Sequence, residues 1–335
     1  MDAPAPSLVV VGASAGGVQA LSELVARLPD DLAAAVCVVL HLHAGTESRL
    51  ARILGRAGPL AAEQAQPAQQ LVAGRILVAP PDQHLLVRDR HALVSRGPHE
   101  NGFRPSIDVL FRSAAVAYGA RTVAVVLSGT RDDGVEGASA IGRRGGSVFV
   151  QDPDDSLFPG LPAATVARDH PHRVLPLAEL AGAVAAAVHR LSEEVAMSEN
   201  EGDAMSLETD YAMLDHDAIE RGGPSGRPSV YSCPECGGVL WEVGDGDQLR
   251  FRCRVGHAYT AEGAVDAQRA SVEEALWTAL RALQERAQLS ERLAGRVGQA
   301  GANQSRRRFE SFAREAREQA EVIRRVLAGA DGTDA

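Results

Sequence analysis

The stretch Val9-Val-Val-Gly-Ala-Ser-Ala-Gly-Gly-Val-Gln-Ala-Leu21 decides the fold of the N-terminal part of this chain. Residues 8–11 form a short apolar, β-branched run that is typical of a buried parallel strand. Gly16 and Gly17 then permit a tight turn, and apolar residues recur at helical spacing. The turn places Ser14 at the carboxyl end of the strand, beside a helix N-terminus that can stabilise developing negative charge. This pattern indicates a nucleophile; a glycine-rich phosphate-binding or packing turn is the alternative.

Composition limits the classes of function. The chain has 335 residues and is 45% hydrophobic, which is enough for one large core plus a smaller module, or for two domains. Its formal net charge of -10 argues against a general nucleic-acid or anionic-membrane binder. All 34 basic residues are arginine, which excludes lysine Schiff-base chemistry and a lysine-bearing phosphate loop. With no signal-peptide pattern and no apolar run long enough to span a bilayer, we expect a soluble cytoplasmic protein without membrane insertion.

The order of apolar runs predicts the fold class. Between residues 8 and 191, short apolar runs alternate with amphipathic stretches, which is typical of a doubly wound, mostly parallel α/β sheet. Residues 85–87 and 92–94 instead predict a small antiparallel hairpin inserted into this scheme. The expected strands of the main sheet are residues 8–11, 36–40, 75–78, 122–127, 147–150 and 173–176.

Side chains with catalytic chemistry follow three of these strands. Ser14 follows the first, His41 follows the second, and the fourth leads into Ser128-Gly-Thr-Arg-Asp-Asp-Gly134. Ligands of open parallel sheets bind beyond the carboxyl ends of the strands, so a serine, a histidine and an aspartate can converge there. In acyl transfer the histidine takes the serine proton and the carboxylate fixes the histidine tautomer. The structural alternative is that each is only a polar cap, with Asp132 or Asp133 capping the next helix.

Five motifs in this order resemble those of the CheB-type protein-glutamate methylesterase domain, over about residues 6–192. The motifs are Gly12-Ala-Ser-Ala-Gly-Gly17, Val38-Val-Leu-His41, Gly74-Arg-Ile-Leu-Val-Ala-Pro-Pro-Asp-Gln-His84, Arg104-Pro-Ser-Ile-Asp-Val-Leu-Phe111 and Leu127-Ser-Gly-Thr-Arg-Asp-Asp-Gly134. Any one of them alone would be weak, whereas five in order over this length are highly specific.

The resemblance implies a function and assigns residues to it. The family's nucleophile falls on Ser14, its general base on His41 and its orienting carboxylate on Asp133, with Asp132 in a variable position. The reaction implied is hydrolysis of glutamate methyl esters on chemoreceptors to glutamate and methanol, often with deamidation of glutamines. Because a serine–histidine pair generates its own nucleophile, we expect no cofactor for catalysis.

The chain departs from the family pattern beside two of these motifs. Leu40 stands before His41 where glutamine is usual, and Thr130 stands where methionine is common. These changes concern substrate contacts, and we expect His43 to be a polar rim residue. Full-length members carry an N-terminal receiver domain, whereas this chain begins almost at the first catalytic strand. We therefore expect a stand-alone enzyme that is either regulated from elsewhere or not regulated.

The last third of the chain carries a metal-ligand pattern. Cys233 and Cys236 form a CxxC pair, and Cys253 and His257 follow with the spacing of a zinc ribbon. Four protein ligands leave no open coordination position, so we expect one structural zinc; a redox CxxC would need a βαβ setting that is absent here. Between the two pairs, two short strands flank residues 244–247 as a hairpin would.

The remaining segments complete the expected organisation. Residues 1–192 form the methylesterase domain, 193–228 an acidic linker with a short helix at 211–219, 229–262 the zinc-ribbon module and 263–329 a helical hairpin. Apolar residues at helical spacing predict helices at 264–295 and 304–327, separated by residues 295–301. The hairpin packs on itself in our preferred interpretation, and a partner-binding or self-associating helix pair is the alternative.

Three hypotheses of function follow from the sequence. The first is the methylesterase, with a methylated chemoreceptor or related signalling protein as substrate and no nucleic-acid partner. The second is a catalytically silent scaffold in a signalling pathway, which methanol release from methylated receptor would exclude. The third, a dinucleotide-binding protein, is disfavoured because the glycine spacing is not G-x-G-x-x-G and no acidic residue ends the second strand.

Overall fold

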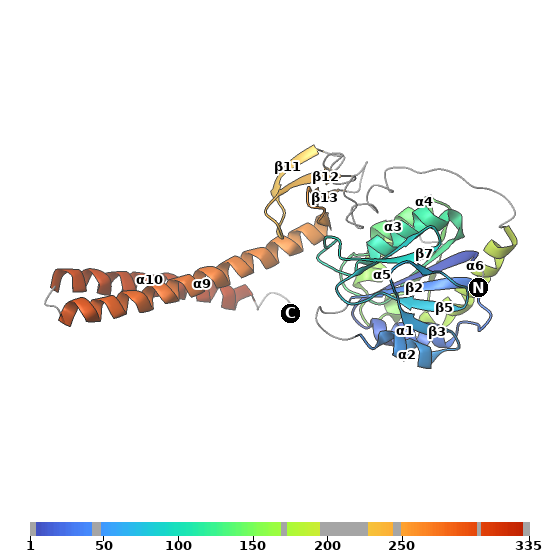
Figure 1. The fold of residues 1–335 in the computed structure, drawn as a ribbon, viewed down its shortest axis with the longest axis horizontal. Coiled ribbons are helices and arrows are strands. Elements are labelled where there is room, and N and C mark those ends of the chain that lie inside the picture. The colour runs from blue at the N-terminus through green and yellow to red at the C-terminus, as the bar shows by residue number, and fades with distance from the viewer. Residues whose placement is uncertain are drawn as a thin grey trace. The chain divides into compact units, whose positions relative to one another are not determined.

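A computed structural model of the chain describes residues 5–41, 48–168, 173–194, 227–243, 249–299 and 303–330 (Figure 1). His43, the expected helix at 211–219 and most of the expected acidic linker lie outside these residues.

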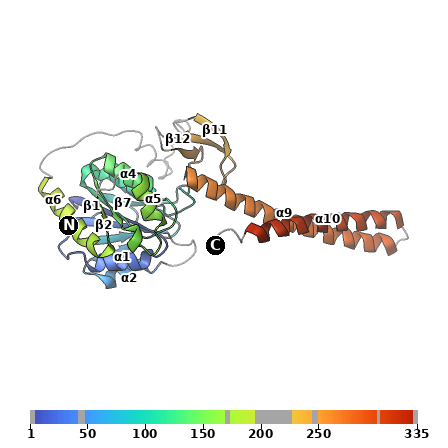
Figure 2. The ribbon, with the colours of Figure 1, turned by 180° about the vertical axis from the view of Figure 1, so that it is seen from behind.

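The N-terminal part is built on a seven-stranded parallel sheet, as the sequence predicts (Figure 2). The order of the strands is β10-β9-β8-β1-β2-β5-β3. They are β1 Ser7–Ala13, β2 Ala34–Leu40, β3 Ala61–Gln64, β5 Arg75–Val78, β8 Thr122–Val126, β9 Ser147–Gln151 and β10 Arg173–Leu175. β3 is not predicted from the sequence, because this edge strand is largely exposed and lacks an apolar run.

Helices cover both faces of this sheet and enclose two apolar layers. One face packs against α1 Gly17–Ala26, α2 Leu50–Ala57 and α6 Leu177–Glu194. The other packs against α3 Ile107–Tyr118, α4 Val135–Arg143 and α5 Gly160–Arg168. Successive residues of β1 alternate between the two layers, since Val9 and Val11 face the first and Leu8 and Val10 the second. This double coverage explains why the central strands are apolar throughout.

A three-stranded antiparallel sheet is formed by one short strand that precedes β5 and two strands between β5 and α3. Its strands are β4 Gln69–Gln70, β6 His84–Arg88 and β7 His91–Ser95, in the order β4-β7-β6. The pairing of β6 with β7 confirms the hairpin predicted at residues 85–87 and 92–94. Two short 3-10 helices, Gly119–Arg121 and Pro153–Asp155, complete this part.

The cysteine-bearing segment forms a four-stranded antiparallel sheet, which we call the ribbon (residues 227–264). Its strands follow one another in sequence order: β11 Arg227–Ser232, β12 Val239–Val243, β13 Arg250–Cys253 and β14 Ala258–Thr260. The pairing of β12 with β13 is the hairpin expected from the sequence.

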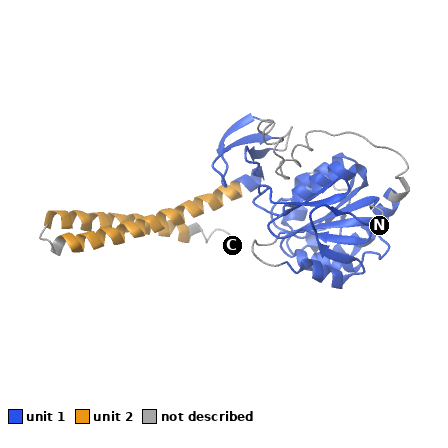
Figure 3. Ribbon diagram, in the orientation of Figure 1, with its two compact units in different colours: residues 1–264 blue, residues 265–335 orange. Residues whose placement is uncertain are grey.

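By its internal contacts the chain divides into two compact units, residues 1–264 and residues 265–335 (Figure 3). The first unit contains both the α/β part and the ribbon. The second consists of a helical hairpin made by α9 Ala261–Gln299, from its second turn on, and α10 Asn303–Ala330. The hairpin is confirmed, but α9 continues past Gly295, because neighbouring Ala294 is buried in the hairpin and packing outweighs the low helix propensity of glycine. Among the described residues, no helix is long and apolar enough to cross a membrane.

Candidate active site

The strand order brings the expected triad residues to one edge of the sheet. β1 lies between β8 and β2, so the carboxyl ends of these three strands are neighbours. Ser14 directly follows β1, His41 directly follows β2, and Asp133 lies in the loop between β8 and α4. Residues far apart in the sequence therefore meet because of the parallel topology alone.

The three side chains form one hydrogen-bonded chain. His41 Nδ1 lies 3.0 Å from Ser14 Oγ, and His41 Nε2 lies 2.8 Å from Asp133 Oδ2. A carboxylate only accepts hydrogen bonds, so the network assigns the proton to Nε2 and leaves the Nδ1 lone pair facing the serine hydroxyl. The two ring nitrogens thus exchange the places that they hold in chymotrypsin-type triads, with the same donor and acceptor logic.

Asp133 is held in a saturated hydrogen-bonding environment at the N-terminus of α3. Its side chain is fully buried, and besides His41 it accepts the Ile107 N–H at 2.7 Å and the Ser106 hydroxyl at 2.7 Å. Burial acts to raise the pKa of Asp133, but the hydrogen bond and charge of His41, together with these donors, outweigh burial and hold it below its usual value. Asp133 is therefore an ionised acceptor.

Asp132, the neighbouring carboxylate, has different surroundings. Its side chain is hydrogen-bonded to Thr260 of the ribbon. Burial raises the pKa of Asp132, and the Thr260 bond offsets this only in part. The structure thus brings Asp133, and not Asp132, to His41.

Several residues at this site carried no clear signal in the sequence. The Phe103 ring stacks on the His41 imidazole, with centroids 3.6 Å apart and an interplanar angle of 6°. Asn101 donates a hydrogen bond from Nδ2 to Asp133 Oδ1 at 3.0 Å. The Asn-Gly dipeptide at 101–102 signals a turn, but nothing in its spacing indicates a contact with a carboxylate. Ser106 is the N-cap of α3, and its hydroxyl also donates to Asp133.

The turn that carries Ser14 is fixed by the loop after β8. The Ser14 N–H donates to the Ser128 carbonyl at 3.0 Å, and the Ser128 hydroxyl donates to the Ala15 carbonyl at 2.9 Å. A Cβ on Gly129 would lie 2.9 Å from the Ser14 Cβ, so only glycine permits this close approach. The Gly17 N–H donates to the Ser14 carbonyl at 2.9 Å and so belongs to the turn itself.

Comparison with known families agrees with this arrangement. The CheB methylesterase family matches residues 9–184, which is more than half of the chain. The chain belongs to the CheB methylesterase family. The crystal structure of the Thermotoga maritima CheB methylesterase catalytic domain is similar to it, with a TM-score of 0.52 and 27% identity over 54% of this chain and 97% of that one.

The chain is also similar to curated proteins that are named protein-glutamate methylesterase/protein-glutamine glutaminase. Protein-glutamate methylesterase/protein-glutamine glutaminase 4 of Myxococcus xanthus (strain DK1622) is 39% identical over 183 residues, or 54% of this chain and 52% of that protein. A counterpart from Anaeromyxobacter dehalogenans (strain 2CP-C) is 44% identical over 165 residues, or 49% of this chain and 48% of its own. The chain spans about half the length of the curated relatives it matches.

Outside the CheB methylesterase match, the ribbon gathers a set of metal-ligating atoms. The Sγ atoms of Cys233, Cys236 and Cys253 and an imidazole nitrogen of His257 all lie within 4.8 Å of one another. Cys236 Sγ is 3.6 Å from Cys253 Sγ, which in turn is 3.5 Å from His257 Nδ1. A tetrahedral metal with metal–sulfur bonds of about 2.3 Å requires sulfur–sulfur edges of roughly 3.8 Å. The donor set and its spacing therefore fit a four-coordinate metal ion.

Glu235 lies on the outer side of this set of candidate ligands. Its Oε2 lies 3.3 Å from His257 Nε2 and accepts a hydrogen bond from His99 Nδ1 at 2.8 Å. Tyr259 donates its hydroxyl to Oε1 at 3.1 Å. Carboxylates commonly orient metal-bound histidines in this way. His99 comes from the α/β part, so that part completes the outer surroundings of the ribbon's ligands.

Proposed function

We propose that the protein is a serine-type carboxylic-ester hydrolase that demethylates glutamate methyl esters of a chemoreceptor or related signalling protein. The observation that carries this proposal is the chain of hydrogen bonds from Ser14 through His41 to Asp133. The names of the curated relatives support both the ester substrate and a second activity, deamidation of protein glutamine.

The chemistry follows from the two sides of the His41 ring. Ser14 Oγ attacks the ester carbonyl carbon while His41 Nδ1 takes its proton. The tetrahedral intermediate collapses by breaking the bond to the methoxy oxygen, and the proton on Nδ1 passes to this leaving group to give methanol. Water then attacks the acyl-serine with His41 again as the base, which releases glutamate and restores Ser14. For a glutamine substrate the leaving group is ammonia.

Asp133 and the turn after Ser14 stabilise the charges that arise. The buried carboxylate keeps the proton on Nε2 and stabilises the imidazolium formed during attack. For the oxyanion we assign the backbone N–H groups of Ala15 and Gly16, because that of Gly17 already binds the Ser14 carbonyl. The stacked Phe103 ring fixes the plane of the imidazole.

The other segments receive supporting roles in this proposal. Cys233, Cys236, Cys253 and His257 would hold one zinc ion, which supplies folding energy to the ribbon and leaves no ligand position for substrate. We assign residues 1–192 as the catalytic domain, 193–228 as a linker, 229–262 as the zinc-ribbon module and 263–329 as a helical hairpin for self-packing or a partner.

Methanol release tests the proposed reaction. Membranes bearing chemoreceptors methylated with a radiolabelled methyl group are incubated with the protein, and volatile methanol is measured. We expect release by the wild-type chain and none above background by Ser14→Ala, which keeps the fold. Equal release by both would exclude Ser14 as the nucleophile, and no release by either would favour a scaffold without catalytic activity.

A further inference from the structure

The loop that supports Asp133 is paired with the ribbon by backbone hydrogen bonds. The Asn101 N–H donates to the Ala258 carbonyl at 2.8 Å, and the Ala258 N–H donates to the His99 carbonyl at 3.3 Å. Glu100 thereby forms a parallel bridge with Ala258 of β14. Within the first unit, residues 99–101 thus act as a short extra strand at the edge of the ribbon sheet.

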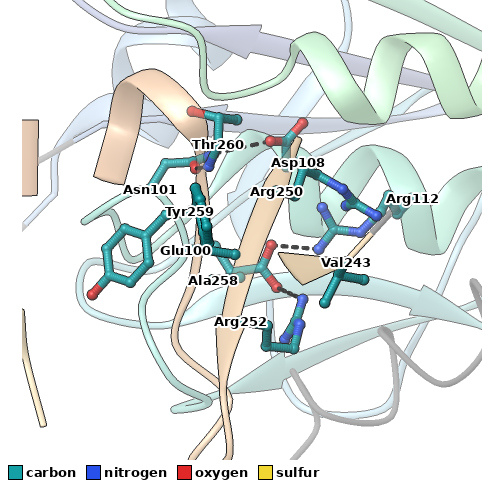
Figure 4. A pocket seen from close by; sticks show the side chains of 11 residues that line it. Glu100, Asn101, Asp108, Arg112, Val243, Arg250, Arg252, Ala258, Tyr259 and Thr260 are labelled. Carbon is teal, nitrogen blue, oxygen red and sulfur yellow. Dashed lines mark hydrogen bonds and ion pairs between the residues drawn. The ribbon is translucent and has the colours of Figure 1, made fainter. Parts of the chain in front are cut away.

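A buried charge cluster fastens the same contact (Figure 4). Glu100 is 3% exposed and lies between Arg112 of α3, to which it is hydrogen-bonded, and Arg252 of β13, 3.2 Å away. Arg252 also donates to the Gly256 carbonyl at 3.0 Å. Buried charges are stable only when paired in this way, so the cluster specifies one docked arrangement.

The Asn101 side chain connects the ribbon to the triad. It is 5% exposed, and its Oδ1 accepts the Thr260 N–H at 2.9 Å. Its Nδ2 donates to Asp133 Oδ1 and to Asp108 Oδ2, each at 3.0 Å. The Thr260 N–H requires an acceptor, and the two carboxylates require a donor. These neighbours therefore fix which amide atom of Asn101 is the oxygen and which is the nitrogen. Thr260 therefore fixes the orientation in which Asn101 Nδ2 donates its hydrogen bond to Asp133.

The junction is a packed contact and not a ligand pocket. The cavity among Glu100, Asn101, Asp108 and the facing ribbon residues has a volume of about 10 Å³. This is the lower limit for a single water molecule. The Asn101 amide therefore has little room to turn, and the Thr260 N–H of the ribbon fixes the position of its Oδ1.

We propose that Asn101 is a positioning residue for Asp133, and that the ribbon, organised by its four metal ligands, holds Asn101 in place. This inference rests on the proposed function, because it concerns the same triad. Cys253 ends β13, and His257 directly precedes β14, which contacts Asn101. Metal binding at these ligands would therefore support the triad through β14, although no metal contacts the substrate.

The expected effect is partial. Without Asn101, Asp133 keeps the hydrogen bonds to His41, Ile107 and Ser106, but loses the donor that it shares with Asp108. A hydrogen bond to a charged group is worth enough to change a rate by roughly tenfold to a hundredfold. We expect a loss in that range, far smaller than the loss on removing Ser14.

The first experiment measures Ser14 reactivity independently of the natural substrate, in the full chain. A fluorophosphonate reagent labels activated serines, and its second-order rate constant is measured for wild type, Asn101→Gly and the control Gly102→Asn. Asn101 has a φ of 53°, which glycine adopts without strain. Gly102 has a φ of 76° with open space at its Cβ, and asparagine tolerates this conformation.

We expect Asn101→Gly to label roughly tenfold or more slowly and Gly102→Asn within about twofold of wild type. With methylated receptor, Asn101→Gly should lower kcat and leave KM unchanged, because Asn101 contacts Asp133 and not the substrate. An unchanged labelling rate in folded Asn101→Gly would overturn the positioning role. If Ser14→Ala labels as fast as wild type, the proposed function itself fails, which is a distinguishable result.

The second experiment uses no substitution at the triad loop. The wild-type chain is stripped of metal with a strong chelator, and metal content, labelling rate and hydrogen exchange of residues 99–101 are followed before and after zinc is restored. We expect labelling to slow by a factor similar to that of Asn101→Gly, exchange to increase, and both to recover with zinc. Val230→Ser, at an exposed ribbon position, is the control and should respond as wild type does. Labelling that stays constant while zinc is lost would contradict the dependence on the ribbon.

Discussion

The α/β part and the ribbon of the first unit obtain their stability from different sources. The α/β part has two extensive apolar layers, one on each face of its sheet. The ribbon buries few large apolar side chains, mainly Leu240, Phe251 and Tyr259, besides two of its cysteines. A segment of this size buries little apolar surface, so we expect a bound metal to supply much of its folding free energy.

The two regions also differ in their expected roles, since one carries the proposed catalytic residues and the other contacts the loop that supports them. The proposed triad belongs to the α/β part, whose topology alone brings the strand ends together. The contact between the two regions is polar and charged, centred on Glu100 and Asn101. A buried polar group that loses its partner lowers the stability of the folded protein. Unfolding of the ribbon would therefore disturb the loop beside Asp133.

The largest expected effect is that loss of the metal unfolds the ribbon but not the α/β part. Metal analysis of the reduced protein should give one zinc per chain, and Cys236→Ser should lower this content greatly. Structural zinc supplies on the order of 10 kcal/mol in small zinc-binding folds, so the ribbon should unfold while the α/β part stays folded. Hydrogen exchange in β12 and β13 against that in β1 and β8 checks this. Protection of the ribbon that persists without metal would show that it has a sufficient core of its own.

The next largest effect should be the difference in ester hydrolysis between variants of the two adjacent aspartates. Asp133→Asn should reduce ester hydrolysis by about 10⁴-fold, because an amide favours the wrong histidine tautomer. Asp132→Asn should reduce it by only a few fold, since Asp132 is hydrogen-bonded to Thr260. The two rates, measured as methanol release, compare neighbouring carboxylates in the same loop. A crippled Asp132→Asn with a near-normal Asp133→Asn would reverse the assignment.

The sequence predicts those features that depend on local patterns and on parallel topology. Apolar runs ending in polar residues predicted the central strands, and they placed Ser14, His41 and the pair Asp132 and Asp133 at strand ends, which converge in a parallel sheet. Only the family resemblance favoured Asp133 over Asp132. The spacing of the CxxC pair and of Cys253 and His257 predicted a set of four metal ligands. The structure brings the donor atoms of these residues within 4.8 Å of one another. The edge strand β3 lacks an apolar run and was not predicted.

Contacts between segments distant in the sequence were beyond such reasoning. Asn101 meets Thr260 across 159 positions, and His99 meets Glu235 across 136. Neither pair has a periodicity, a motif or a fixed spacing that would indicate a contact. The stacking of Phe103 on His41 likewise depends on the path of a loop rather than on its composition.

The charge cluster between the regions should contribute a smaller, but measurable, free energy. Arg252→Met removes one of the two cationic partners of Glu100, and Arg112 keeps the carboxylate paired. The cost should therefore lie below the roughly 3–5 kcal/mol of a buried charge that has lost its whole pair. We expect faster hydrogen exchange of residues 99–101 and 258–260, with metal content retained. Arg254→Met is the matched control, because Arg254 is exposed in the neighbouring turn. Equal exchange in both variants would mean that backbone pairing alone holds the contact.

The smallest expected effect is a pair of opposite pH dependences at Asp133 and Asp108, the two carboxylates that share the Asn101 amide. The pKa of Asp133 lies below its unfolded value, because the hydrogen bond and charge of His41 and further donors outweigh burial. Asp133 therefore contributes stability that is fully present above about pH 4, the ordinary carboxyl value, and is lost as pH falls through its lower folded pKa.

Burial and then the charge of Asp133 hold the pKa of Asp108 well above its usual value, so the folded state takes up a proton there. Its contribution to stability decreases as pH rises above about 4 toward that folded pKa. Unfolding free energies of wild type, Asp133→Asn and Asp108→Asn across the acid range check both signs. The advantage of wild type over Asp133→Asn should shrink below about pH 4, whereas its stability relative to Asp108→Asn should decrease as pH rises above that point. Parallel slopes for the two variants would show that the carboxylates titrate alike and that the shared amide does not distinguish them.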